Sequence, residues 1–239
     1  MAQSQKKNPK ESQKKSTEAN TKDLADLTPE ELRAPLLDAV LAHIPFDGWT
    51  SKAVENAAAD LHISNEMAEL SFPGGATEML EAHLNNANIL LADKLATLNL
   101  PSMKIRDRIT LAVRTRLEQS AENQEVVRRG LFTLALPQNL VLGSKALWNS
   151  ADTMWRAAGD TSTDHNWYTK RATLSAVYSA VLLFWLNDES EGYADTWGFL
   201  DRRIEDVMKI ETAKYKMRQT TANFPSLSRF LGRLRYPGG

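Results

Sequence analysis

The stretch from Phe46 to Leu84, FDGWTSKAVENAAADLHISNEMAELSFPGGATEMLEAHL, contains the pattern that decides the fold. Apolar residues spaced by three and four positions predict a helix that starts after Thr50-Ser51. A short turn at His62-Ile63-Ser64 leads into a second, shorter helix over Asn65–Leu70. The residues Phe72-Pro73-Gly74-Gly75 then break the chain before the next helix. This order predicts a helix-turn-helix arrangement.

The sequence on both sides of this stretch is also helical. Thr28-Pro29-Glu30-Glu31 is typical of a helix start, with Thr as the N-cap, Pro at the first helical position and Glu three residues after the cap. Gly159 suits the end of a helix, and the oxygens of Asp160–Asp164 suit the start of one over about His165–Leu186. Because no segment alternates like a strand, we expect an all-α fold of about nine or ten helices.

The helix-turn-helix spacing resembles the DNA-binding head of TetR-family repressors, with Leu70-Ser71-Phe72 at the place of their aromatic pair. The resemblance implies a TetR-repressor-like helical bundle. The charge of the stretch argues against nucleic acid, because Phe46–Leu84 holds one basic residue, Lys52, and seven acidic residues, a net charge of −6. Neutralisation of phosphates supplies most non-specific affinity for DNA. We therefore expect a degenerate head that binds no nucleic acid.

Composition predicts four segments along the chain. Residues 1–26 form a Lys-rich tail that we expect to be disordered, because Met1–Lys22 has six lysines and almost no apolar residues. Residues 27–84 form the degenerate helix-turn-helix head. Residues 85–217 form a second helical domain, for which the family resemblance given below implies lipid binding and dimerisation. Residues 218–239 form a linker and an amphipathic helix.

The amino-acid composition excludes several kinds of chemistry. The chain has 29 basic and 30 acidic residues, no cysteine and four histidines. The lack of cysteine excludes disulfides, thiol nucleophiles and zinc or iron–sulfur sites with Cys ligands. No phosphate-binding glycine loop, nucleophile elbow or histidine-based metal motif is present. We therefore predict no catalytic residue, no metal and no resident cofactor.

The centre of the chain carries a specific resemblance. The residues concerned run from Leu147-Trp148 through Asp152, Met154-Trp155, Ala158-Gly159-Asp160, the run STDHNWYTKR over Ser162–Arg171, Val177-Tyr178 and Asp188 to Thr196-Trp197-Gly198-Phe199-Leu200. This pattern resembles the COQ9 family of ubiquinone biosynthesis accessory proteins, over about Leu27 to Met217. The resemblance implies a TetR-like fold, a homodimer, a lipid-binding cavity and docking to the hydroxylase that modifies the quinone ring.

The resemblance also implies which residues dock the hydroxylase. They are Met154, Asp164, Trp167, Tyr168 and Arg171. On the residues alone, two aromatics at a helix start with Arg171 on the same face have the composition of a binding hot spot. Packing of Trp167 or Tyr168 into a core fits the same residues, so the sequence leaves both interpretations open.

The helix that follows is apolar on all sides. Ala172–Leu186 contains no charged residue, so it is expected to be buried, and it is too short to span a bilayer. A simple core helix and a helix that lines a cavity both fit this pattern. The resemblance favours a lipid pocket lined by seven residues, namely Phe132, Leu136, Leu140, Leu174, Tyr178, Val181 and Trp185.

The end of the chain has the pattern of a membrane-surface helix. Apolar residues at Leu227, Phe230, Leu231 and Leu234 are spaced by three and four positions. Basic residues lie between them, and no acidic residue occurs from Phe224 to Gly239. Such segments bind anionic lipid surfaces, so we predict membrane contact through the four apolar residues with Arg229 and Arg233. Docking of the segment on the protein itself is the alternative.

These observations predict a non-enzymatic lipid-binding accessory protein of ubiquinone biosynthesis. It would bind an isoprenylated quinone intermediate, or another lipid, and present it to a ring hydroxylase. We expect a homodimer at a membrane surface, either the cytoplasmic face of a bacterial inner membrane or the mitochondrial inner membrane of a eukaryote. A TetR-type transcriptional regulator with a hydrophobic effector is the alternative, and an enzyme of unknown class is the second.

Overall fold

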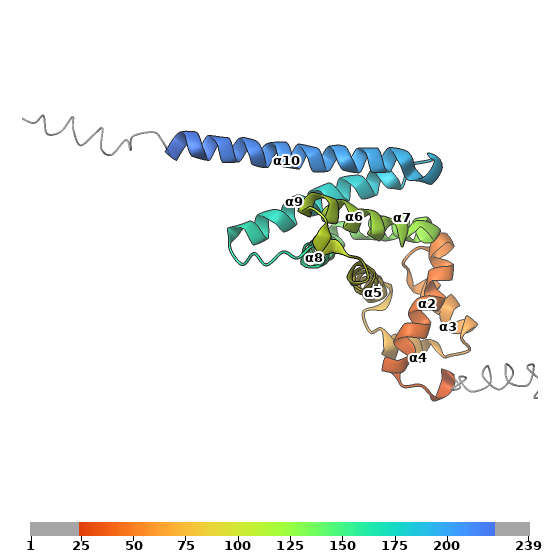
Figure 1. Cartoon of the computed structure of the whole chain (residues 1–239). Helices are drawn as coiled ribbons and strands as arrows, with labels where there is room; N and C mark the ends of the chain where they lie inside the picture. Colours follow the sequence, from red (N-terminus) through yellow and green to blue (C-terminus); the bar gives the residue numbers. More distant parts are fainter. Residues whose placement is uncertain (1–23, 223–239) are drawn as a thin grey trace, which may run out of the picture. The chain divides into compact units, whose positions relative to one another are not determined.

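The structure, a computed structural model, describes residues 24–222, which are almost entirely helical (Figure 1). Within this range there are nine α-helices, five short 3-10 helices and no strand, which confirms the predicted all-α class. The α-helices are α2 (Pro29–Asp47), α3 (Ser51–Asp60), α4 (Asn65–Ser71), α5 (Gly75–Ala96), α6 (Ile105–Glu118), α7 (Gln124–Leu134), α8 (Leu140–Ala157), α9 (His165–Trp185) and α10 (Ala194–Ala222).

The described chain divides into two compact units. The first unit contains residues 24–90 and 120–146, and the second contains residues 91–119 and 147–222. The sequence predicts a head over 27–84 and one continuous domain over 85–217, whereas in the structure residues 120–146 belong to the same unit as the head. The helices α5 and α8 contribute residues to both units.

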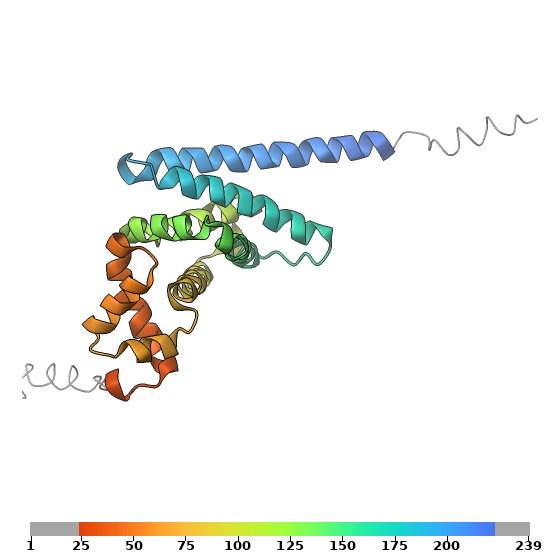
Figure 2. The ribbon, with the colours of Figure 1, turned by 180° about the vertical axis from the view of Figure 1, so that it is seen from behind.

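The first unit forms around the predicted helix-turn-helix segment, seen from behind in Figure 2. Thr28 caps α2 as expected: its hydroxyl accepts a hydrogen bond from the Glu31 backbone N–H at 3.3 Å, and the Glu31 carboxylate accepts one from the Thr28 N–H at 3.0 Å. Pro35 lies inside α2 without ending it. The core of the unit contains Leu36, Val40, Ile44, Ala53, Ala57, Phe72, Met79 and Leu80, all of them buried.

Helix α7 joins this core through a close approach at Gly130. A Cβ atom at this position would lie 3.3 Å from Leu80 Cδ1 and 3.5 Å from Trp49 Nε1. The position is buried. A larger side chain would therefore have to displace either neighbour, so the glycine is explained by packing rather than by a helix end.

The second unit is built on α6, α9 and α10, and α10 runs alongside α9 (Figure 1). Val181 and Trp185 of α9 are completely buried, and Leu200 of α10 is 1% exposed. Helix α6 also buries one face, which contains Ile109, Ala112, Val113 and Leu117. Ile105, the first residue of α6, is 46% exposed.

The turn between α9 and α10 is held by Asp188. Its carboxylate accepts hydrogen bonds from the backbone N–H groups of Ser190 and Thr196, both at 2.8 Å, and from the Thr196 hydroxyl at 2.5 Å. Burial alone would raise the pKa of Asp188, but these hydrogen bonds outweigh it and lower the pKa to about 2. The carboxylate therefore stays charged and fixes the start of α10.

We predict that Gly130→Val destabilises the first unit. The added side chain must displace Leu80 or Trp49, and overpacking of this kind costs about 1–3 kcal/mol in free energy of unfolding. Urea denaturation measures this loss. Arg128→Val places the same β-branched residue on the exposed side of α7 and is the matched control. Equal stabilities of the two variants would show that α7 does not pack closely at Gly130.

Candidate docking site

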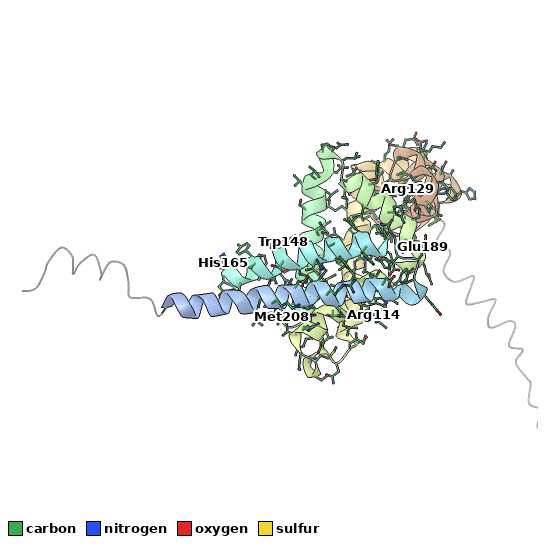
Figure 3. The ribbon with its side chains drawn as sticks, turned by 90° about the horizontal axis from the view of Figure 1, so that it is seen from above. Arg114, Arg129, Trp148, His165, Glu189 and Met208 are labelled. Carbon is green, nitrogen blue, oxygen red and sulfur yellow. The ribbon has the colours of Figure 1, made fainter. Side chains whose placement is uncertain are left out.

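Three aromatic side chains gather on one surface of the second unit. Trp148 comes from α8, and Trp167 and Tyr168 come from the first turn of α9. The ring centroids of Trp148 and Trp167 are 5.5 Å apart, and those of Trp167 and Tyr168 are 4.7 Å apart. Figure 3 shows Trp148 near the end of α9 at which His165 lies. We call these three residues the aromatic patch.

Tyr168 is the most open member of the patch, with 62% of its surface exposed. Trp148 and Trp167 are half-buried. Aromatic side chains that are partly open and already packed against one another lose little freedom when a partner covers them, which is why such residues dominate binding hot spots. The patch therefore has the chemistry of a protein-docking surface.

The patch is held by the connection between α8 and α9. Gly159 has a positive φ of 87° and ends α8. The backbone N–H of Gly159 donates to the Arg156 carbonyl and that of Asp160 donates to the Trp155 carbonyl, each at 3.0 Å. The Arg108 guanidinium donates to the Ala158 carbonyl at 2.8 Å, which ties the same turn to α6. The prediction of a helix end at Gly159 is confirmed.

Asp164 starts α9, as the sequence predicts. Its side chain accepts hydrogen bonds from the backbone N–H and the side-chain amide of Asn166, both at 3.0 Å. This cap places Trp167 and Tyr168 in the first turn. Asp164 is exposed, so its carboxylate is accessible to a partner as well.

Asp160 is the centre of a buried ionic cluster. Its carboxylate is 3% exposed and accepts hydrogen bonds from Lys170 Nζ at 2.6 Å, from the Ser162 hydroxyl at 2.8 Å and from Arg171 Nη1 at 3.0 Å. Burial alone would raise the pKa of Asp160. The three donors outweigh burial and hold the pKa well below its usual range.

Arg171 completes the cluster from α9 and is 1% exposed. Its Nε donates to Asp152 Oδ1 at 2.5 Å, and its Nη1 also donates to the Trp167 carbonyl at 3.2 Å. The guanidinium carbon lies 4.2 Å from the centroid of the Trp167 ring, in cation–π contact.

The five predicted docking residues all belong to the second unit but differ in access. Asp164 and Tyr168 are exposed and Trp167 is half-buried, so these three can contact a partner. Met154 is completely buried and Arg171 nearly so. Direct contact of these two residues with a partner does not fit their burial, because Met154 packs in the core and Arg171 is enclosed by two carboxylates and a ring.

The sequence analysis includes Asp152, Asp160 and Lys170 in the family resemblance, and Asp160 also as a possible cap, but it does not predict their ionic cluster. One local signal for Asp152 exists, because Arg156 lies four residues later on α8 and its Nε donates to Asp152 Oδ2 at 2.6 Å. No local spacing indicates the pairing of Asp152 with Arg171, which joins two helices. Trp148 was among the residues of the family resemblance but not among the predicted docking residues.

The seven residues predicted for a lipid pocket fall into two groups. Leu174, Tyr178, Val181 and Trp185 form the buried side of α9, with exposures of 0–5%. The other three lie in the first unit and are open: Phe132 is 74% exposed, Leu140 55% and Leu136 36%. Their part in binding lipid stays a prediction.

The predicted membrane contact lies outside the described residues. It comprises Leu227, Phe230, Leu231, Leu234, Arg229 and Arg233. Among residues 24–222, no helix is both long and apolar enough to cross a bilayer. The same range contains no group of three His, Asp or Glu side chains arranged to hold a metal ion.

We predict that Asp160→Asn is less stable than wild type at neutral pH and loses less stability than wild type as the pH falls. Because folding lowers the pKa of Asp160 from its ordinary value of 3.8, the unfolded state binds the proton first as the pH falls. The stabilisation is fully present above about pH 4 and is lost below it. Removing the charge of a buried pair costs about 3 kcal/mol at neutral pH.

Urea denaturation at several pH values from 7 to 2 measures this dependence. The Asn variant should be less stable at pH 7 and should lose less stability in acid than wild type. Asp201→Asn, at an exposed position of α10, is the control. A variant with the wild-type pH profile would mean that Asp160 is not paired in the folded chain.

Comparison with known proteins places this arrangement in a family. The COQ9 family model matches residues 140–211, which include the aromatic patch and the ionic cluster. The rat protein named "Ubiquinone biosynthesis protein COQ9, mitochondrial" is 35% identical over 193 residues, which cover 77% of this chain and 62% of that protein. The Xenopus laevis protein COQ9-B is 32% identical over 202 residues, which cover 80% of this chain and 67% of that protein.

A solved structure shows the same fold. The TetR transcriptional regulator from Nitrosomonas europaea superposes with a TM-score of 0.60 at 20% identity, over 73% of this chain and 96% of that chain. This confirms the predicted TetR-like fold. The chain spans 62% of the rat relative and 60% of the human one. With the family match and the shared identity over most of its length, the chain belongs to the COQ9 family.

Proposed function

We propose that this protein is a non-enzymatic, lipid-binding accessory protein of ubiquinone biosynthesis. It binds isoprenylated quinone intermediates and presents them to the hydroxylase that modifies the quinone ring. Its relatives from rat and human are named ubiquinone biosynthesis proteins, which supports the pathway. The observation that carries the proposal is the partly exposed aromatic patch of the second unit, because it lies in the segment that matches the family model.

Lipid binding is supported by apolar side chains that the first unit leaves open. Phe132 and Val141 are 74% and 83% exposed, and Leu140 is 55% exposed. An isoprenoid tail is insoluble in water, so a carrier must offer apolar surface to it. Burial of each such side chain against a lipid contributes about 1.5–3 kcal/mol.

In this proposal, the hydroxylase docks on the aromatic patch when the protein presents the lipid to it. Trp167 and Tyr168 contact the partner, and Asp164 contributes a charged edge beside them. The lipid-binding and docking surfaces then belong to different units of the chain. We assign no catalytic step to the protein, because the hydroxylase performs the chemistry on the ring.

The proposal includes a homodimer at a membrane surface. Support for self-association comes from the α9–α10 side of the second unit, where Leu183 is 58% exposed and Phe184 stacks on Phe199 at 4.6 Å between centroids. These residues line a groove of about 570 Å³. Membrane contact would use the basic apolar segment near the end of the chain. The relatives are named mitochondrial, which supports a mitochondrial location for a eukaryotic source.

We predict that the purified protein carries an isoprenylated quinone intermediate and that the double variant Phe132→Ser/Leu140→Ser carries less of it. Serine removes the apolar surface that the tail needs, so the bound fraction should fall severalfold. Organic extraction followed by mass spectrometry identifies and quantifies the lipid in each preparation.

The matched control is Leu70→Ser/Ile89→Ser. It removes two other exposed apolar side chains of the first unit, 64% and 59% open in wild type. Equal lipid content in both double variants would place the binding surface elsewhere. A wild-type protein without any bound or exchangeable isoprenoid would overturn the carrier function.

A second candidate function, transcriptional regulation, is favoured by the TetR-like fold alone. The surface of the head opposes it. Helix α4, at the place of a recognition helix, carries Glu66 and Glu69, both exposed, and no Lys or Arg. Recognition helices meet a polyanion and depend on basic residues for affinity.

We therefore predict that the intact protein leaves a duplex DNA probe unshifted at physiological salt. Electrophoretic mobility shift with a random 30-mer duplex measures binding, and Glu66→Lys/Glu69→Lys provides a variant in which repulsion by α4 is reversed. Salt-dependent binding by the wild-type protein would favour a repressor over a carrier.

A further inference from the structure

We propose that Arg171 is a positioning residue that sets the orientation of Trp167 in the aromatic patch, rather than a residue that contacts the docking partner. The inference rests on the proposed function, because it concerns the docking surface assigned there. It assigns two different roles to the residues of that surface. Trp167 and Tyr168 meet the partner, while Arg171, Asp152 and Asp160 hold them in place from beneath.

The geometry of the guanidinium carries the inference. Arg171 spans two carboxylates from different elements, Asp152 of α8 at 2.5 Å and Asp160 of the connecting loop at 3.0 Å. The same group donates to the Trp167 carbonyl and lies 4.2 Å from the Trp167 ring centroid. One planar cation therefore fixes α8, the loop, and both the backbone and the ring of Trp167.

The Arg171–Asp160 pair is closed to solvent, which excludes direct contact by Arg171. The side chains of Arg171 and Asp160 are 2% and 3% exposed, whereas Tyr168 is 62% exposed. A partner that covers the patch meets the rings and not the guanidinium. The effect of Arg171 on docking must then pass through the position of Trp167.

Arginine suits this position better than lysine. A guanidinium is planar and donates from several nitrogens, so it can bridge two carboxylates while its face lies on a ring. A lysine ammonium is a compact charge that cannot do both. Arg171→Lys therefore keeps the positive charge of the cluster and removes the planar group that bridges the two carboxylates and contacts the ring. This makes it the informative variant.

The other members of the cluster reduce the effect on folding. Asp152 also accepts from Arg156 Nε at 2.6 Å, and Asp160 also accepts from Lys170 Nζ at 2.6 Å. Each carboxylate thus retains a basic partner when Arg171 is shortened. We expect Arg171→Lys to fold and to loosen the ring of Trp167.

The experiment uses the full chain labelled with 5-fluorotryptophan at its six tryptophans. Fluorine NMR then reports each indole separately, and Trp167→Phe assigns the resonance of Trp167. In Arg171→Lys this resonance should shift and broaden, while those of the buried Trp49 and Trp185 stay unchanged. Binding to the purified ring hydroxylase, measured by calorimetry well below the melting temperature, should weaken about tenfold because the ring must be ordered on docking.

Two variants calibrate the result. Arg156 is the other arginine bound to Asp152, and its side chain is 71% exposed and has no ring contact among the described residues. Arg156→Lys should therefore leave both the resonance and the affinity at wild-type values. Tyr168→Ala removes an exposed ring and should weaken binding without moving the Trp167 resonance as far. If Arg171→Lys does not fold, Asp152→Asn replaces it and should produce the same shift to a smaller degree.

Each outcome decides the inference. An unchanged Trp167 resonance in a folded Arg171→Lys variant overturns it, since the ring then keeps its place without the guanidinium. Wild-type affinity together with a shifted resonance overturns the link to docking. A wild-type protein that does not bind the hydroxylase overturns the proposed docking function, and the fluorine spectrum still tests whether Arg171 positions Trp167.

Discussion

The buried pairing of Arg171 with Asp152 and Asp160 is the interaction on which the candidate site depends. It fixes helix α8, the loop after Gly159 and the first turns of α9 relative to one another. Burying charged groups is costly unless every charge is paired and hydrogen-bonded, and here both carboxylates have two basic partners. Such a cluster tolerates few alternative arrangements, so the aromatic rings above it have one defined position.

The sequence predicts the helical class and several helix ends because these are set by short-range chemistry. Thr28 with Glu31, Gly159 and Asp164 each satisfy backbone groups within a few residues of themselves, and all three appear as expected. The division into two units could not be predicted in the same way. Residues 120–146 belong with the head because α7 packs against Leu80 and Trp49 through Gly130. No local sequence pattern indicates this contact.

For the candidate site, the sequence indicates a segment whose aromatic rings lie close together in the structure, and it misjudges the access of two side chains. Arg171 follows Trp167 by four residues and resembles an exposed hot-spot arginine, yet it is buried. Burial of a charge depends on partners supplied from elsewhere, here from Asp152 nineteen residues before it. Met154 is misjudged for a related reason, because an apolar residue on α8 fits a surface patch or a core equally well until its neighbours are known.

The burial of the ionic cluster also sets how the protein responds to ionic strength. Dissolved ions screen charges that face water and act weakly on pairs enclosed by protein. The Arg33–Glu78 pair of the first unit has about 30% of each side chain open, and Lys145 of the Lys145–Glu81 pair is 60% open. Added salt therefore weakens these surface pairs while the enclosed Arg171–Asp160 pair keeps its strength. The aromatic patch should retain its shape across the range of salt concentrations that different cells and compartments maintain.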